Sequence, residues 1–234
     1  MTEPKVVYRV HDSWLAASER RMMLAIAARL PRAATPDIMT GLGLAGALLC
    51  GLGYIASAWT SAGLLVACLG IVLNWLGDSL DGNLARLRKI ERPTYGFFID
   101  HNTDVVAQVF IFFCMGLSPY MRFEAACLCL LSYWLASLYT FIRAVSIGRF
   151  QISYFGVGPT EIRIALVLYT AAMFALGNLK FDFGAYLPVG RFAPIDAFSV
   201  PLFAGVFGLY LWMVWGEGRR LAAEDLANRA AKLD

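Results

Sequence analysis

The chain has 234 residues, of which 59% are hydrophobic and only 16% are charged, with a mean hydropathy of +0.61. Soluble domains are about 45–50% apolar and about 25% charged, so this composition excludes an ordinary water-soluble globule. The formal net charge of +3 does not indicate nucleic acid binding, because the basic residues bracket apolar segments, where they favour contact with anionic lipid headgroups.

An amphipathic helix is the first predicted element, over residues 12–30. This segment is too charged to span a membrane, so it is expected to lie along the membrane surface beside the first span. Its apolar side chains recur at helical spacing, and its charged side chains take the other side. The apolar set is Trp14, Leu15, Met22, Ile26 and Leu30, and the charged set is Glu19, Arg20 and Arg21.

Six apolar blocks follow, and most approach the ~20 residues that cross the hydrocarbon core of a bilayer. Apolar side chains surround each block, so these helices are expected to face lipid or other helices on every side. The segment 181–197 is ambiguous, and five or seven spans are alternatives to six. The six predicted spans are residues 38–57, 61–76, 97–117, 125–145, 162–176 and 198–215.

These elements predict an all-α integral membrane protein with one membrane domain over residues 1–234. Its transmembrane core covers 37–216, and residues 217–234 form a polar cytoplasmic tail with helical character. With six spans, one side of the membrane receives all but three of the 20 Lys and Arg residues, the exceptions being Arg122, Lys180 and Arg191. The positive-inside rule therefore predicts a protein of the inner (cytoplasmic) membrane with both termini in the cytoplasm.

Four aspartates lie where the second predicted span ends and the third begins: Asp78, Asp81, Asp100 and Asp104. On helices, the members of the two pairs lie about 60° and about 40° apart, so each pair shares one helix face. The short connection is expected to bring the pairs together at the cytoplasmic surface, and costly carboxylates at a membrane edge indicate function. Hard oxygen ligands of this kind suit Mg²⁺, Mn²⁺ or Ca²⁺, and two such ions can clamp a pyrophosphate.

Small and basic residues accompany the acids. Gly82 allows a nucleotide or phosphate to approach the helix backbone. Arg86 lies one turn further on, where its guanidinium can hold a phosphate. The acids and these neighbours together predict a site for a phosphorylated ligand.

The run from Asp78 to Asp104 resembles the signature of the class I CDP-alcohol phosphotransferase (CDP-alcohol phosphatidyltransferase) family. That signature is D-x-x-D-G-x-x-A-R, a spacer, and then G-x-x-x-D-x-x-x-D, and every fixed position matches. The resemblance implies a membrane enzyme of phospholipid biosynthesis. Such an enzyme transfers a phosphate-linked group from a CDP-activated donor to an alcohol and releases CMP.

The resemblance also implies roles for individual residues. The four aspartates would hold two divalent ions, Mg²⁺ or Mn²⁺, that bind the CDP pyrophosphate, and Asp104 would deprotonate the attacking hydroxyl. A homodimer is expected from the resemblance alone. Asp37 stands where the family has Asn in a T-P-N-x-x-T element near the nucleotide, so this chain departs from the family there. Besides Asp37, the CDP-binding residues would be Asp78, Asp81, Gly82, Ala85 and Arg86.

Two features resemble the choline/ethanolamine phosphotransferase branch. His101 follows the third aspartate, where the branch has a candidate base for a lipid hydroxyl, although Phe97 replaces the Glu that the branch has four residues earlier. Residues 158–161, Gly-Pro-Thr-Glu, resemble its G-P-x-E element. Plain alternatives are a polar interfacial histidine and an ordinary helix start with Thr as the cap. The candidate acceptor-binding residues are Arg143, Arg149, Glu161 and Arg163, although topology alone also accounts for the arginines.

Two substrate pairs therefore stay open. A CDP-linked amino alcohol can donate to a lipid hydroxyl, and the branch features favour this pair. Alternatively, CDP-diacylglycerol donates to a polar alcohol such as inositol phosphate, glycerol phosphate or serine. The rivals from other classes are an ion or proton transporter and a purely structural membrane subunit, but transporter sites tend to lie near the bilayer midplane on broken helices.

Overall fold

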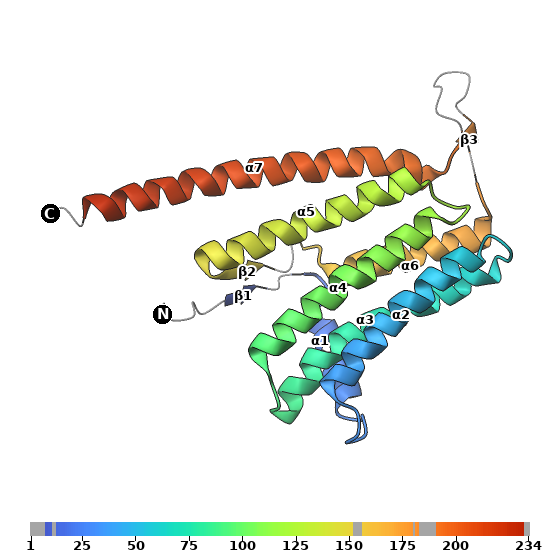
Figure 1. Ribbon diagram of the computed structural model, residues 1–234, viewed down its shortest axis with the longest axis horizontal. Helices are drawn as coiled ribbons and strands as arrows, with labels where there is room; N and C mark the ends of the chain where they lie inside the picture. Colours follow the sequence, from blue (N-terminus) through green and yellow to red (C-terminus); the bar gives the residue numbers. More distant parts are fainter. Residues whose placement is uncertain (1–7, 11–12, 152–155, 180, 183–190, 232–234) are drawn as a thin grey trace.

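The computed structural model describes residues 8–10, 13–151, 156–179, 181–182 and 191–231, and within them the chain forms seven helices and two pairs of short strands (Figure 1). The helices are α1 (Ala16–Ala27), α2 (Pro36–Ala56), α3 (Ala62–Arg88), α4 (Pro93–Gly116), α5 (Phe123–Ile147), α6 (Pro159–Leu176) and α7 (Pro194–Ala230). The strands are β1 (Tyr8–Val10), β2 (Arg149–Gln151), β3 (Phe181–Asp182) and β4 (Arg191–Phe192).

Helices α2 to α7 are each long and apolar enough to cross a bilayer, which confirms the prediction of six spans and an all-α multi-pass membrane protein. Two helices run beyond the predicted spans. Helix α3 continues to Arg88, twelve residues past the predicted end at residue 76, and α7 continues through the charged tail to Ala230. A 37-residue helix is roughly 55 Å long, so α7 exceeds a ~30 Å hydrocarbon core and extends past the end of α5 (Figure 1). The described part of segment 181–197 forms β3, β4 and the start of α7.

Helix α1 is present, and its predicted apolar face is confirmed at Ile26 and Leu30, which pack against a buried cluster that includes Leu80 and Leu84 of α3, but it is wrong at Trp14 and Met22. Met23 and Ala27 are buried against α3, whereas Trp14 and Met22 are 76% and 41% exposed. Glu19, expected on the outer side, lies one turn before Met23 and faces α3. The packed face is therefore the Glu19–Met23–Ala27 stripe, because hydrogen bonds inside the protein satisfy the Glu19 carboxylate.

Helices α2 and α3 approach each other through glycine. A Cβ at Gly46 would collide with the α3 backbone at Asn74, and a Cβ at Gly77 would collide with the α2 backbone at Gly43. Small residues permit such close backbone approach in membranes, where van der Waals packing and hydrogen bonds hold helices together. The Asn74 amide donates a 3.0 Å hydrogen bond to the Gly43 carbonyl across this contact. The contact therefore fixes the register of α3 directly beside Asp78.

The remaining helices pack onto this pair and onto one another. Helix α4 packs on α2, α6 packs on α3, α5 packs on α4, and α7 packs on α5 (Figure 1). A buried 2.6 Å hydrogen bond joins the Tyr54 hydroxyl of α2 to the Thr170 hydroxyl of α6. At the start of α7, the Asp196 carboxylate accepts hydrogen bonds from the backbone N–H groups of Ala193 and Arg122, both at 2.8 Å. These contacts connect α6 and α7 to the rest of the bundle.

Strands β1 and β2 were not predicted. They pair in parallel, with Tyr8 opposite Arg149, and they join the N-terminal segment to the chain that follows α5. The Trp14 N–H continues this connection by donating a 3.1 Å hydrogen bond to the Gly156 carbonyl. Together with the carboxyl end of α7, the two strands lie at one end of the bundle (Figure 1).

We expect Gly46→Ala to destabilise the protein by about 1–3 kcal/mol, because the added methyl group must push α2 away from α3. Gly41→Ala is the matched control in the same helix, since a Cβ at Gly41 meets no atom within 4 Å. Thermal unfolding of the purified variants in one detergent measures the effect. A Tm for Gly46→Ala equal to that of the control would contradict the close-contact explanation.

Candidate metal and phosphoryl-transfer site

The four aspartates lie within α3 and α4 and not at their ends. Helix α3 runs ten residues beyond Asp78, and α4 begins seven residues before Asp100, so the connection between the helices is only residues 89–92. Lys89 closes α3 in a left-handed conformation with φ of 56°, which lets the chain turn at once into α4. The site is therefore recessed by about 15 Å along α3 from the helix end.

Three of the aspartates converge. Asp78, Asp100 and Asp104 can each direct one carboxylate oxygen to a common point, with these atoms all within 4.8 Å of one another. A small cavity of about 10 Å³ lies against all four aspartates, with Thr40, Asn74 and Thr103 completing its wall. Because its lining is polar and oxygen-rich, this space suits a small hard cation.

Asp81 is held differently from the other three. Its side chain is 8% exposed and accepts a 2.8 Å hydrogen bond from the Thr40 hydroxyl of α2 and a second from the backbone N–H of Gly82. The two bonds orient Asp81 at the back of the small cavity. Thr40 is the last residue of the predicted T-P-D-x-x-T element, so this element reaches the site through Thr40.

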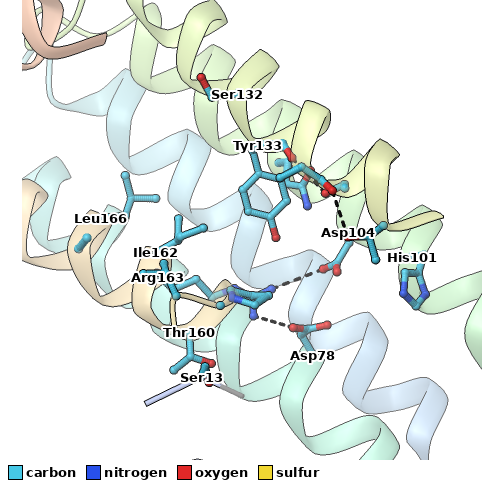
Figure 2. Close-up of a pocket in the computed structure, with 18 of the residues that line it drawn as sticks. Ser13, Asp78, His101, Asp104, Ser132, Tyr133, Thr160, Ile162, Arg163 and Leu166 are labelled. Carbon is cyan, nitrogen blue, oxygen red and sulfur yellow. Dashed lines mark hydrogen bonds and ion pairs between the residues drawn. The ribbon is translucent and has the colours of Figure 1, made fainter. Parts of the chain in front are cut away.

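Arg163 supplies a positive charge between the acidic residues. Its guanidinium lies 2.6 Å from Oδ2 of Asp78 and 3.5 Å from Oδ1 of Asp104 (Figure 2). Its side chain is only 16% exposed, so water screens these pairs weakly. Sequence reasoning named Arg163 as an acceptor-binding candidate, and the structure shows that it links α6 to the aspartates of α3 and α4.

The carboxylate oxygens of the site are the kind of ligand that a divalent metal ion prefers. Asp78, Asp100 and Asp104 can bind a cation, and the all-oxygen donor set matches Mg²⁺ or Mn²⁺, whereas zinc sites usually include Cys or His ligands. Arg163 provides one positive charge for this group, which leaves net negative charge for a metal to neutralise.

His101 and Tyr133 occupy opposite sides of this group. The His101 ring lies tilted against the Phe97 ring and edge-to-face with the Phe141 ring. Its Nδ1 lies 2.8 Å from the Phe97 carbonyl and 3.7 Å from Oδ2 of Asp100. In Figure 2 it lies beyond Asp104 as seen from Arg163. Tyr133 of α5 points its hydroxyl toward the ion-paired group (Figure 2). Sequence reasoning missed Tyr133, because no local pattern distinguishes it from an ordinary aromatic residue of a span.

A cavity of about 1040 Å³ opens from the aspartates into the membrane domain. Polar groups line the end that contains the aspartates, and apolar side chains of α4, α5, α6 and α7 line the rest. Phe112, Met115, Leu166, Leu202 and Val206 belong to this apolar part. The cavity therefore joins a charged site to a space with the chemistry of lipid chains.

The predicted CDP-binding residues divide into two groups. Asp78, Asp81, Gly82 and Arg86 line the large cavity, and Arg86 donates a 3.2 Å hydrogen bond to the Asn83 amide oxygen. Asp37 and Ala85 are not among the residues that line it. Asp37 forms an ion pair with Arg92, which joins the start of α2 to the chain before α4.

The other acceptor candidates have structural contacts. Arg143 lies 3.8 Å from the Glu217 carboxylate, so it joins α5 to α7 and does not line the cavity. The Glu161 carboxylate accepts backbone hydrogen bonds from Gly158 at 2.9 Å and Leu15 at 3.1 Å. Gly158 and not Thr160 is the N-cap of α6, so residues 158–161 form a helix start that also holds the N-terminal segment. The side chain of Arg149 lies outside the described residues.

Helix α1 covers the polar end of the site through Glu19. The Glu19 carboxylate accepts hydrogen bonds from Trp75 at 2.9 Å, Ser79 at 2.8 Å and Thr160 at 2.7 Å. These three donors come from α3 and α6, so one carboxylate joins three helices. Sequence periodicity could not reveal this role, because it assigns a charged residue of an amphipathic helix to the outer face.

Fold and site together define a multi-pass membrane protein in which carboxylates on two adjacent helices, capable of binding metal, face a largely apolar cavity. The sequence matches the CDP-alcohol phosphatidyltransferase family over residues 33–214, well over half of the chain, and the protein belongs to that family. It is therefore an enzyme, a transferase of phospholipid biosynthesis, and not an ion transporter or a structural subunit. No curated protein matches the chain.

Removal of the Arg163 charge should expose the repulsion among the aspartates. We expect Arg163→Gln to lower stability by about 2–3 kcal/mol without divalent metal, a fall in Tm of roughly 5–10 °C. Added Mn²⁺ should raise the Tm of this variant more than that of the unmodified protein. Thermal unfolding with and without Mn²⁺ measures both effects.

Arg122→Gln is the control, because its exposed pair with Glu124 contributes little. An Mn²⁺-induced rise in Tm that is the same in the unmodified protein and in Arg163→Gln would show that Arg163 and the metal do not act on the same charges.

Proposed function

We propose that the enzyme transfers a phospho-amino-alcohol group from a CDP-linked donor to the hydroxyl of a lipid acceptor and releases CMP. The observation that carries the proposal is the convergence of Asp78, Asp100 and Asp104 at the polar end of the large apolar cavity. A lipid acceptor would place its chains in the apolar part and its hydroxyl at the aspartates. The presence of His101 beside Asp100 is consistent with this substrate pair.

The reaction we propose is a direct displacement. The acceptor oxygen forms a bond to the β-phosphorus, the bond from that phosphorus to the oxygen bridging to the α-phosphorus breaks, and CMP leaves with the bonding electrons. Asp104 takes the proton of the hydroxyl, with His101 as the alternative base. Arg163 and Arg86 stabilise negative charge on the phosphates.

Asp78, Asp81, Asp100 and Asp104 are the proposed ligands of two divalent ions, Mg²⁺ or Mn²⁺. When bound, these ions neutralise the pyrophosphate and the charge that develops on the leaving CMP. The chain itself positions the groups: Thr40 orients Asp81, Arg163 orients Asp78 and Asp104, and the apolar wall limits the access of water to the reacting phosphorus.

A second substrate pair has its own support. The polar end of the cavity carries Arg163 at the aspartates, where its guanidinium can bind the phosphate of a polar acceptor. The apolar part would then hold the chains of CDP-diacylglycerol. In this alternative, inositol phosphate, glycerol phosphate or serine attacks.

A matrix of donors and acceptors with Mg²⁺ or Mn²⁺ distinguishes these pairs. We expect CMP release from CDP-choline or CDP-ethanolamine with diacylglycerol or ceramide, and the lipid product should appear in equal amount. Release of CMP from CDP-diacylglycerol with a polar alcohol would support the second pair instead. No CMP release from any combination would reject both.

Asp104→Asn tests the assignment of the base. It should retain CDP binding and lose about 10²–10⁴-fold in CMP release, because the amide cannot accept the hydroxyl proton. Asp225→Asn, in the exposed tail of α7, is the control and should retain full activity. Near-normal CMP release by Asp104→Asn would overturn the assignment.

We also propose that the site and both termini face the cytoplasm, as the distribution of Lys and Arg indicates. The fit of a cytosolic nucleotide donor supports this orientation. A tag placed after residue 234 should be cleaved by protease only in vesicles whose cytoplasmic face is outside, and cleavage in vesicles of the opposite orientation would contradict it. The expected homodimer stays a prediction.

A further inference from the structure

Three arginines among the described residues line the large cavity: Arg20, Arg86 and Arg163. Arg163 pairs with Asp78 and Asp104, and Arg86 donates to Asn83 beside Gly82. The side chain of Arg20, on α1, makes no hydrogen bond or ion pair with any described residue. It therefore presents a guanidinium to the cavity without a countercharge of its own.

The position of Arg20 is fixed by its neighbour. Glu19 accepts hydrogen bonds from Ser79, which directly follows Asp78, and from Thr160 at the start of α6. One turn later, Met23 is fully buried against Leu80 and Leu84 of α3. Since α1 is held on both sides of Arg20, this residue lies over the turn of α3 that carries Asp78 and Gly82.

A guanidinium that lines a cavity without a countercharge favours the binding of an anion. Arg163 contacts Asp78 and Asp104, and Thr40 donates to Asp81, and none of these carboxylates pairs with Arg20. Arg forms paired, charge-assisted hydrogen bonds with phosphate oxygens. Because α1 lies on the cytosolic side of the site in the proposed orientation, the phosphate that approaches past it is that of the nucleotide.

We propose that Arg20, positioned by Glu19, binds the diphosphate of the CDP-linked donor and thereby makes α1 part of the nucleotide site. This inference rests on the proposed function, because it assumes a CDP-linked donor. It holds for either substrate pair, since both donors carry the same diphosphate. Glu19 is a positioning residue and acts only through α1.

Calorimetric titration of CDP, CMP and cytidine into the purified protein with Mn²⁺ tests the proposal. Arg20→Gln should weaken CDP binding about tenfold, the loss expected for one charge-assisted hydrogen-bonded contact, and leave cytidine binding unchanged. Arg20→Lys should retain part of the affinity. Arg21→Gln is the matched control, because Arg20 and Arg21 are both exposed, but Arg21 bonds the Ala17 carbonyl of its own helix and does not line the cavity.

Measurement of Tm distinguishes a role of Arg20 in binding from a role in folding. Arg20→Gln should retain the Tm of the unmodified protein. Glu19→Ala should lower both the Tm and the affinity for CDP, because α1 loses its hydrogen bonds to α3 and α6. A fall in Tm for Arg20→Gln as large as that for Glu19→Ala would overturn the binding role. The titrations are repeated in nanodiscs of zwitterionic and of partly anionic lipid, and a loss seen only with anionic lipid would assign Arg20 to bulk headgroups instead.

The two proposals fail in different ways. If the unmodified protein binds CDP and Arg20→Gln binds it equally well, the role of Arg20 is wrong and the proposed function stands. If the unmodified protein does not bind CDP with Mn²⁺, both are wrong.

Discussion

The structure depends on keeping several carboxylates together inside membrane helices. Charged groups at that depth are costly unless they are paired, hydrogen-bonded or bound to a metal. Here three of the four have such a partner, because Arg163 contacts Asp78 and Asp104, and Thr40 donates to Asp81. These partners lie on α6 and α2, so neutralising the acids on α3 and α4 requires four helices to assemble around one point.

Close packing makes that assembly possible. The glycine contacts between α2 and α3 bring Thr40 within hydrogen-bond distance of Asp81, which bulkier residues at Gly43 and Gly77 would prevent. Helix α1 is fastened by polar contacts instead. Arg88 donates hydrogen bonds to the carbonyls of Leu30 and Pro31 after α1, and Glu19 accepts three from α3 and α6. A surface helix thus becomes a wall of the cavity.

Sequence alone predicted the spans and the aspartate cluster, because hydropathy and the spacing of acids are local signals. It placed the end of α3 too early, since hydropathy falls at Asp78 although the backbone continues as a helix. It placed Glu19 on the outer face of α1 and missed Tyr133, because the positions of both side chains depend on contacts with helices distant in the sequence. Two further contacts, those of Arg163 with the aspartates and of Glu161 with Leu15, likewise follow only from tertiary packing.

The recessed position of the aspartates has a consequence for the reaction. A lipid hydroxyl cannot move far into water without exposing its chains, and a nucleotide cannot enter the hydrocarbon core without losing its hydration. The polar end of the cavity lies between these limits, about 15 Å below the end of α3 and next to the apolar wall. In the proposed reaction, only the phosphates of the donor would need to reach the aspartates, and the proposed contacts with Arg20, Arg86 and Arg163 would replace the water that those phosphates lose. The same arrangement limits the access of bulk water to the phosphorus, which favours transfer to an alcohol over hydrolysis.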